Sequence, residues 1–408
     1  MKNDSTSPQI DEPKITGRRS KITLPLAGIR VVSLELAIAA PLCTRYLADM
    51  GADVIKIERP GSGDFARQYD SAAGKDMSSW FVWANRGKRS LALDLKKPEN
   101  RAVLHRLLAR SDIFVQNMAP GSVERLGLDT DTLERLYPRL ITCFISGYGS
   151  TGPYRERKAY DLLLQGEAGV FAMTGTPEQP SRAGVSVSDI SSALYSFSSL
   201  LLALRQRDLT GEGSHIETSL LNSTVEWVAP YLYYLQGTGR VPRRTAQRNS
   251  VIVPYGLYPV KDGKVNLAVQ NDEQWRRLCR VVLKRPDLAE NNLYNSNEKR
   301  VAARNEIEPI IERVFSELTI NELEVQLIEA DVPFGRVNEL KDVAEHPQLR
   351  AQNRFVELTM QDGSTFEVLA TPFGLQNLPQ LFVPPPYIGQ HTEEILREIE
   401  LESKIKGR

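Results

Sequence analysis

The fold is decided by residues 29–57, IRVVSLELAIAAPLCTRYLADMGADVIKI. Residues 29–34 are typical of a short buried strand. Pro41 then stands where a helix can begin, and residues 42–50 continue that helix to Gly51, a residue type that commonly ends one. Residues 54–57 are a second short apolar run. A strand, a helix and a strand in this order predict the first unit of a parallel α/β sheet.

The same alternation continues toward the middle of the chain. Apolar runs at 90–93, 113–115 and 140–145 predict further strands, and helical spacing of apolar residues predicts helices over 99–110, 190–206 and 220–235. Between 237 and 250 the composition shifts to Gly, Arg, Thr and Pro (GTGRVPRRTAQRNS), which indicates a linker. Asp-Gly pairs at 262–263 and 362–363 then predict two hairpins, with helices over 272–283, 302–317 and 320–329 and from 392.

These elements predict an α/β protein with a Rossmann-like large domain, which contains the parallel sheet, and a smaller α+β domain. We expect a disordered or extended tail over 1–24, the first part of the large domain over 25–225 and a linker over 226–255. The small domain is expected over 256–345, and residues 346–408 are expected to return to the large domain. A chain of 408 residues is long enough for two domains of this kind.

Composition excludes several classes of protein. There are 51 Lys and Arg residues and 51 Asp and Glu residues, so the formal net charge is zero, which argues against binding to nucleic acid or to a membrane surface. The first 23 residues lack the apolar segment of a signal peptide, and we find no apolar run long enough to span a membrane. The three cysteines, Cys43, Cys143 and Cys279, show no CxxC spacing, which is typical of a protein from a reducing cytoplasm.

Three motifs have an ordinary structural interpretation that we favour. Residues 61–66 (GSGDFA) formally match the dinucleotide-binding pattern, but polar residues follow where that pattern opens an apolar helix, so a plain loop is expected. Cys43 has Leu42 and Tyr46 as neighbours, and we expect a core cysteine rather than a nucleophile. The histidines show no metal-ligand spacing, and we expect neither a metal nor a redox cofactor.

Two aspartates and several basic residues have both a structural and a functional interpretation. Asp189 stands directly before the helix predicted over 190–206, and on position alone an N-cap is favoured over an ionised carboxylate facing a cleft. Asp161 precedes another apolar run and has the same two interpretations. Arg59, Lys96 and Arg125 lie just beyond predicted strands or in loops. Such residues usually make the surface soluble, but ligands bind at the carboxyl ends of parallel strands, and Arg suits phosphate.

The chain resembles the family III CoA-transferases, a family that includes formyl-CoA transferase, carnitine CoA-transferase and α-methylacyl-CoA racemase. The resemblance extends over residues 26–396. It is carried by the opening block at 39–64, and by NRGKRS at 85–90, LDLK at 93–96, VQNMAPG at 115–121, GYG at 147–149, TGEG at 210–213 and GQHT at 389–392.

This resemblance implies a Rossmann-like large domain, a small domain and a homodimer of two interlocked subunits. It implies that coenzyme A passes from an acyl-CoA to a small carboxylic acid through an aspartyl mixed anhydride and an aspartyl-CoA thioester. Asp189 matches the nucleophile, Asp161 matches a second acidic position, and the amide of Ala39 falls where it faces the reacting carbonyl. The positions that match CoA-binding groups are Arg59, Leu93, Lys96, Asn117, Met118, Arg125 and Lys158.

Departures from the family pattern bear on the substrate. Ile38 stands where formyl-CoA transferase has glutamine, which argues against oxalate and formyl-CoA. We expect C4–C5 dicarboxylic acids such as mesaconate, succinate, malate or citramalate, with transfer within one molecule still open. The Arg- and Thr-rich residues 240–249 would suit a distal carboxylate, although a surface linker is favoured.

Two other functions remain as alternatives. In the racemase branch of the family, a His directly before the aspartate matched by Asp161 serves as a base for proton exchange. This chain has Tyr160 at that position, which argues against racemisation. The second alternative is a protein that binds coenzyme A or a dinucleotide without catalysis. The retained Asp189 and the set of CoA-site residues argue against it.

Overall fold

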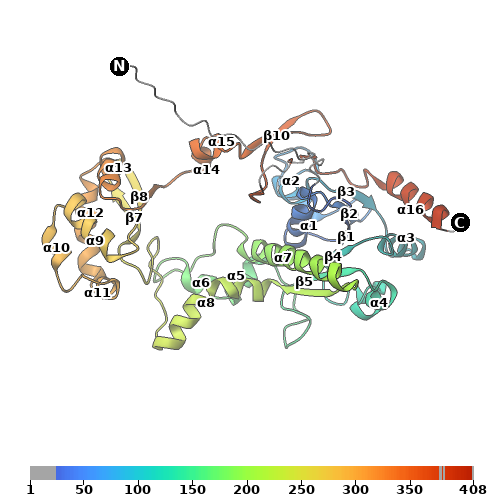
Figure 1. Ribbon diagram of the computed structural model, residues 1–408, viewed down its shortest axis with the longest axis horizontal. Helices are drawn as coiled ribbons and strands as arrows, with labels where there is room; N and C mark the ends of the chain where they lie inside the picture. Colours follow the sequence, from blue (N-terminus) through green and yellow to red (C-terminus); the bar gives the residue numbers. More distant parts are fainter. Residues whose placement is uncertain (1–23, 376–378, 380–381, 407–408) are drawn as a thin grey trace, which may run out of the picture.

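The computed structural model describes residues 24–375, 379 and 382–406, so all but the last residue of the tail predicted over 1–24 lies outside the described residues. The backbone forms a large and a small lobe, which two separate connections join (Figure 1). One connection follows α8 (Leu220–Thr238), and the other follows β9 (Phe334–Arg336). The chain therefore follows the outline of an open ring.

The large lobe contains a six-stranded parallel sheet in the order β3-β2-β1-β4-β5-β6. Its strands are β1 (Arg30–Leu34), β2 (Asp53–Glu58), β3 (Arg89–Ala92), β4 (Ile113–Gln116), β5 (Ile141–Ser146) and β6 (His215–Ser219). Val32 pairs with Ile55 on one side and with Phe114 on the other, so β1 lies in the middle. The predicted fold class, an α/β protein with a parallel sheet, is confirmed.

Helices cover both faces of this sheet, as a sheet of parallel strands requires. On one face, α1 (Ala39–Asp49) and α7 (Val187–Thr210) share an apolar cluster with β1, β4 and β5. On the other face the cluster contains α3 (Pro98–Leu108), α4 (Thr130–Leu136) and α16 (Thr392–Lys406). By length and composition α7 would suffice to cross a membrane, but half of its apolar window is buried against α1 and the sheet.

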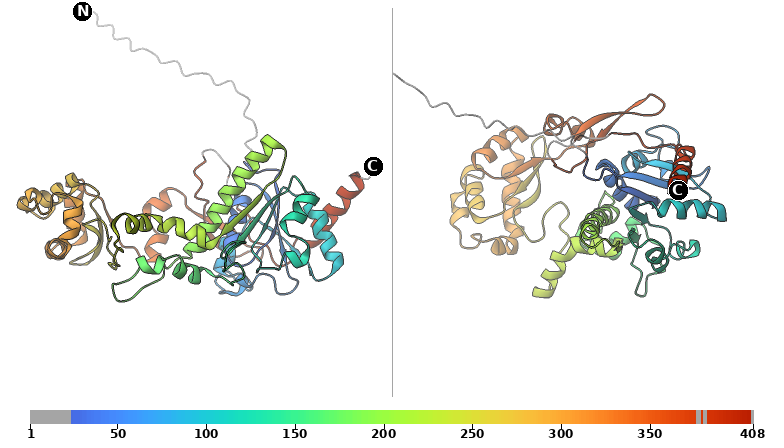
Figure 2. Two further views of the ribbon diagram at one scale, coloured as in Figure 1. Left: turned by 90° about the horizontal axis from the view of Figure 1, so that it is seen from below. Right: turned by 45° about the vertical axis from the view of Figure 1, so that its right-hand side comes forward.

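The end of the chain lies against the beginning of the sheet. Ile395 and Ile399 of α16 are buried in the same cluster as Val32 of β1. Arg89 of β3 donates hydrogen bonds to Glu394 and Glu398 at 2.9 and 2.7 Å. The two ends of the chain thus contribute to one core, and Figure 2 shows α16 beside the blue strands of the large lobe.

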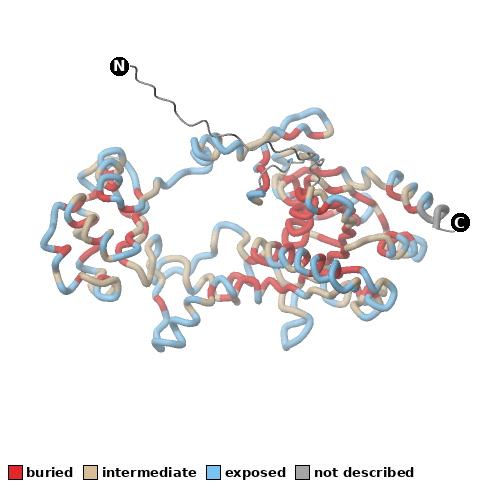
Figure 3. The backbone as a smooth tube through the Cα atoms, in the orientation of Figure 1, coloured by how far each residue is buried: buried red, intermediate tan, exposed pale blue. Residues whose placement is uncertain are grey.

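The small lobe has its own core. The antiparallel strands β7 (Tyr255–Val260), β8 (Gly263–Ala268) and β9 pack against helices around the buried side chains of Tyr258, Trp275 and Phe315. Those helices are α9 (Asp272–Arg277), η3 (Leu278–Val282), α10 (Pro286–Glu290), α11 (Asn297–Ala302), α12 (Arg304–Ser316) and α13 (Ile320–Glu329). Figure 3 shows buried backbone in each lobe and largely exposed backbone in the connection that leads from β9 to α15.

The remaining elements surround the sheet or lie between the lobes. They are η1 (Phe65–Gln68), α2 (Ser79–Asn85), η2 (Glu124–Leu126), α5 (Asp161–Glu167), α6 (Val170–Met173), α14 (Leu340–Ala344), α15 (Pro347–Ala351), β10 (Phe355–Thr359) and β11 (Thr365–Leu369). The strands β10 and β11 form the predicted hairpin. Arg86 donates a hydrogen bond to the carbonyl of Leu369 at 2.6 Å, which ties this hairpin to the large lobe.

Candidate active site

The first turns of α1 and α7 lie side by side at the carboxyl edge of the sheet. Helix α1 connects the end of β1 to the start of β2, and α7 ends shortly before β6 starts. Because the strands are parallel, both helices run from the carboxyl edge to the amino edge. The rings of Tyr46 and Phe197, two turns along each helix, are 5.7 Å apart. Ala39 and Asp189 therefore lie near each other, where ligands of such sheets bind.

Asp189 is not an N-cap, so the structural interpretation favoured from the sequence is wrong. Helix α7 begins at Val187, which places Asp189 inside the first turn. The capping contact comes from Asp161 instead, whose Oδ1 accepts a hydrogen bond from the amide of Ser188 at 2.8 Å. Asp161 is itself the first residue of α5, and Tyr160 occupies the N-cap position of that helix. With its capping role taken by another side chain, the Asp189 carboxylate is available for chemistry.

A buried glutamine extends this contact to the segment before α7. The Nε2 group of Gln165 donates to Oδ2 of Asp161 at 2.7 Å and to the carbonyl of Val185 at 3.2 Å. Its Oε1 accepts a hydrogen bond from the amide of Ala183 at 2.9 Å. Asp161 and Gln165 thus fix the backbone over residues 183–188 and, through it, the place of Asp189.

The environment of Asp189 makes its carboxyl group unusually weak as an acid. Burial, followed by the negative charge of Asp161, raises the pKa of Asp189 from 3.8 to about 7. The residue is nevertheless partly exposed. A carboxylate with a raised pKa is also a stronger nucleophile once it is ionised, and perturbed carboxyl groups of this kind are concentrated at functional sites.

The candidate CoA-binding residues all follow strands of the same sheet edge. Arg59 comes directly after β2, Leu93 and Lys96 come after β3, and Asn117, Met118 and Arg125 come after β4. Lys158 lies in the segment between β5 and α5. The side chains of Arg59, Lys96, Arg125 and Lys158 are exposed, whereas that of Leu93 is buried. Four cationic groups at the edge of a parallel sheet suit the phosphates of a nucleotide.

Asn117 is bonded to the protein backbone through both polar atoms of its side chain. Its Oδ1 accepts from the amide of Leu36 at 2.9 Å, and its Nδ2 donates to the carbonyl of Leu36 at 2.8 Å. Both polar atoms of the side chain are therefore directed at the segment that follows β1.

A buried network of charges lies below this edge, and it was not identified from the sequence. Lys56 and Asp64 form an ion pair at 2.8 Å, and Lys88 and Glu35 form another at 2.6 Å, all four with side chains that are fully buried. Burial lowers the pKa of Lys88 to about 8, although Glu35 opposes that shift. The signal in the sequence was Lys56, a charged residue within the apolar run of β2.

A second group of the network surrounds Glu58, at the end of β2. Its carboxylate accepts hydrogen bonds from Arg67 at 2.9 and 2.8 Å and from the hydroxyl of Ser90 at 2.6 Å. Arg67 also donates to the carbonyl of Pro386 at 2.9 Å and lies 3.8 Å from the ring centroid of Phe81. Residues 61–64 thus form a loop, as expected, whereas residues 65 and 66 begin η1. Asp64 and the neighbouring Arg67 are held by buried ion pairs.

Cys43 is confirmed as a core residue. Its side chain is buried, and burial raises its thiol pKa well above the ordinary value, so the reactive thiolate is disfavoured.

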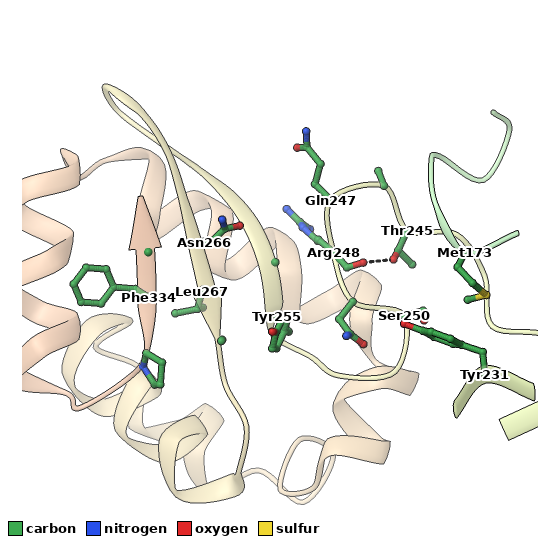
Figure 4. Close-up of a pocket in the computed structure, with 16 residues that line it drawn as sticks. Met173, Tyr231, Thr245, Gln247, Arg248, Ser250, Tyr255, Asn266, Leu267 and Phe334 are labelled. Atoms are coloured by element: carbon green, nitrogen blue, oxygen red, sulfur yellow. Dashed lines mark hydrogen bonds between the residues drawn. The ribbon is translucent and has the colours of Figure 1, made fainter. Parts of the chain in front are cut away.

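A cavity of about 580 Å³ lies between the lobes (Figure 4), and Asp189 is not among its lining residues. Its lining includes Met173 and Tyr231 from the large lobe and Tyr255 and Asn266 from the small lobe. The guanidinium of Arg248, also at this cavity, is bonded to Glu308 and Glu312. Since two carboxylates already neutralise Arg248, this contact favours the interpretation of residues 240–249 as a linker.

Comparison with known proteins identifies the family. Residues 26–392 match the model of CoA-transferase family III. A succinate–glutarate CoA-transferase from Agrobacterium fabrum is 37% identical, with 92% of this chain and 96% of the relative covered. The β subunit of a succinyl-CoA–L-malate CoA-transferase from Chloroflexus aurantiacus is 32% identical, with 92% and 94% covered.

A solved structure supports the same assignment. A CaiB/BaiF family protein from Brucella suis superposes with a TM-score of 0.80 at 32% identity, over 93% of this chain and 100% of that one. The sequence blocks, the parallel sheet and these relatives agree, and the chain belongs to CoA-transferase family III.

Proposed function

We propose that this enzyme moves coenzyme A between C4–C5 dicarboxylic acids and that Asp189 carries both the acyl group and coenzyme A in turn. The observation that carries the proposal is the position of Asp189, inside the first turn of α7 beside Asp161, at the ligand-binding edge of the sheet. Asp161 acts as a positioning residue, because its contact with the amide of Ser188 fixes the turn that presents Asp189.

The reaction proceeds in four acyl-transfer steps. The ionised Asp189 attacks the thioester carbonyl, a C–O bond forms, the C–S bond breaks, and the mixed anhydride and the CoA thiolate result. The thiolate attacks the Asp189 carbonyl of the anhydride, which releases the donor acid and leaves an aspartyl-CoA thioester. The acceptor carboxylate attacks this thioester and displaces the thiolate again. The thiolate then attacks the acceptor carbonyl, which forms the new acyl-CoA and restores Asp189.

The chain supplies two further elements of this chemistry. The amide of Ala39 is in the first turn of α1, where amides have no acceptor within the helix. In this proposal it donates to the transient oxyanion. The cationic residues at the sheet edge hold the nucleotide of CoA, which keeps the released thiolate beside the anhydride. Tethering of this kind contributes on the order of 7–11 kcal/mol to well-oriented reactions.

The choice of acids rests on the relatives. Those already described are named for succinate, glutarate and L-malate, and a third, from Chloroflexus aurantiacus, for D-citramalate. We therefore expect the highest kcat/KM with succinyl-CoA as donor and a C4 or C5 dicarboxylate as acceptor. The test is a panel of acids measured by mass spectrometry of the CoA products, with monocarboxylates of equal length as the control. Equal rates for the monocarboxylates would contradict the proposal.

The pH dependence follows from the pKa of Asp189. Because attack requires the carboxylate, kcat/KM should rise with pH and level off above about 7.

The stability of the fold has the opposite trend with pH, because the raised pKa of Asp189 means that the fold favours the protonated acid. This contribution is complete below pH 3.8 and is lost as the pH rises through about 7. Asp189→Asn should therefore raise the Tm by much more at pH 8 than at pH 4.5. Equal Tm changes at both values would contradict the assignment.

Arg59 and Arg125 are proposed to bind the phosphates of coenzyme A. The Ala variants should lose CoA affinity by roughly tenfold each at low salt and by less at high salt, because salt screens exposed charges. Titration calorimetry at two salt concentrations measures this, with Arg135→Ala on α4 as the control. Unchanged affinity in both variants would reject the role.

The racemase alternative finds no support among the relatives described above. Tyr160, which stands where that mechanism needs a histidine, is 60% exposed.

We propose further that the enzyme is a cytoplasmic homodimer of interlocked subunits. The ring-shaped backbone supports this, as do exposed apolar side chains on α7 and α8, among them Leu202, Leu209, Trp227 and Tyr233. Light scattering should give twice the chain mass of 45.7 kDa, and a monomer would contradict the proposal.

A further inference from the structure

The segment between β1 and α1 is held by side chains from three other elements. They bond the carbonyl of Glu35, both backbone groups of Leu36 and the amide of Ala37. We propose that Asn117 and Asp64 are positioning residues for the transfer reaction, which act by fixing the direction of the Ala39 amide. This inference rests on the proposed function and adds to it two residues that act on the chemical step.

Asn117 acts from the β4 side. Its amide N–H donates to the carbonyl of Leu34 at 3.2 Å, and its side chain then bonds both the amide and the carbonyl of Leu36. This two-sided contact continues the pairing of β1 with β4 beyond the end of both strands. Both the amide and the carbonyl of Leu36 are thereby fixed by one side chain.

Asp64 acts from the opposite side. Its Oδ1 accepts from the amide of Ala37 at 3.1 Å, and its Oδ2 forms the ion pair with Lys56. The Nζ group of Lys56 also donates to the carbonyl of Glu35 at 3.2 Å. Because Asp64 and Lys56 are fully buried, water does not compete for these bonds.

The segment held in this way has an uncommon conformation. Ala37 has a φ of 62°, in the left-handed region that residues with a side chain rarely adopt. Such a conformation persists only where surrounding contacts determine it, and here it turns the chain from β1 into α1. Helix α1 is buried along its whole length, so its start cannot adjust freely. The direction of the Ala39 amide therefore depends on the bonds to Leu36 and Ala37.

Tyr69 is influenced by the charges of both Asp64 and Asp189. The pKa of Tyr69 is raised to about 12 by burial and then by the charges of Asp64 and Asp189. One hydroxyl thus lies within electrostatic reach of both carboxylates. Together with the adjacent first turns of α1 and α7, this supports a position of the held segment near the proposed nucleophile.

The test separates a role in chemistry from a role in CoA binding. Asn117→Ala should lower kcat about 100-fold, the scale expected when a reacting group is misplaced by about 1 Å, while the Kd for CoA stays within about twofold. Asp64→Asn keeps an acceptor for the amide of Ala37 but weakens the bond that holds residue 64 to Lys56. We therefore expect kcat to fall in this variant as well. Asn100→Ala, which removes a 3.0 Å bond to the carbonyl of Asp94 at the same sheet edge, should leave kcat unchanged.

Two results would overturn the inference. One is an unchanged kcat in a folded Asn117→Ala enzyme, and the other is a loss confined to CoA affinity, which would assign the side chain to the ligand. If Asn117→Ala does not fold, kcat and the Kd for CoA are compared in Asn117→Asp instead. This variant keeps the acceptor for the amide of Leu36 but loses the donor to its carbonyl. Hydroxylamine trapping of the wild-type enzyme checks the proposed function separately, because label at Asp189 upholds that function whether or not kcat of the variant falls.

Discussion

Replacing Asp189 by alanine is expected to lower kcat on the order of 10⁴-fold or more, because the side chain that carries each covalent intermediate is gone. Binding of coenzyme A should persist, since the candidate CoA residues follow other strands, β2 to β5. The measurement is steady-state transfer from succinyl-CoA together with calorimetric titration of CoA. Asp208→Ala is the matched control, because Asp208 is an exposed aspartate near the other end of the same helix.

Two results bear on this expectation in opposite ways. Wild-type turnover in a folded Asp189→Ala enzyme would reject Asp189 as the nucleophile. Loss of CoA binding together with activity would show that the residue supports the ligand site instead. Asp189→Asn is a weaker test of chemistry, because an amide keeps the shape and the hydrogen-bonding capacity of the carboxyl group.

Replacing Arg67 by alanine is expected to destabilise the fold by about 3–5 kcal/mol, which is the usual cost of leaving one partner of a buried ion pair alone. Glu58 would keep its charge in a buried site with only Ser90 and the amide of Asp64 as donors among the contacts described. The bond to Pro386 and the contact with Phe81 would be lost as well.

Thermal unfolding followed by circular dichroism measures this effect. Arg155→Ala is the control, because Arg155 is 60% exposed and its ion pair with Glu156 is a surface contact. A Tm of Arg67→Ala equal to that of the control would contradict the structural importance of the pair. Arg67→Lys should recover only part of the loss, since an ammonium group cannot make both bonds to Glu58.

Much of the fold was predictable from local pattern. The apolar strands indicate the parallel sheet directly, and the helix over residues 320–329 is found with those bounds. The first helix ends just before Gly51 as expected, but it begins at Ala39, two residues before Pro41. Such features depend on neighbours along the chain, which the sequence displays. The start of α7 was less predictable, because Asp161, 27 positions away from Ser188, provides its cap. Position alone therefore favoured the wrong role for Asp189.

The buried charges were beyond prediction for the same reason. A lysine or an aspartate is expected at the surface unless its partner is known, and the partners of Glu35 and Glu58 lie up to 53 positions away. Asn117 matched a CoA-binding position by resemblance, yet only the folded chain shows that its side chain bonds to Leu36. Long-range pairs of this type become visible once the topology is known.

The order in which the chain leaves the ribosome has a consequence for the large lobe. Its sheet is encoded by the first 219 residues, but one apolar face is completed by Ile395 and Ile399. Arg67 and Arg89 likewise find partners at Pro386 and Glu398. During synthesis that face is covered by α3 and α4 alone, without α16, until the whole small lobe has emerged. Truncation by a few tens of residues at the carboxyl terminus therefore affects the part of the molecule that is made first.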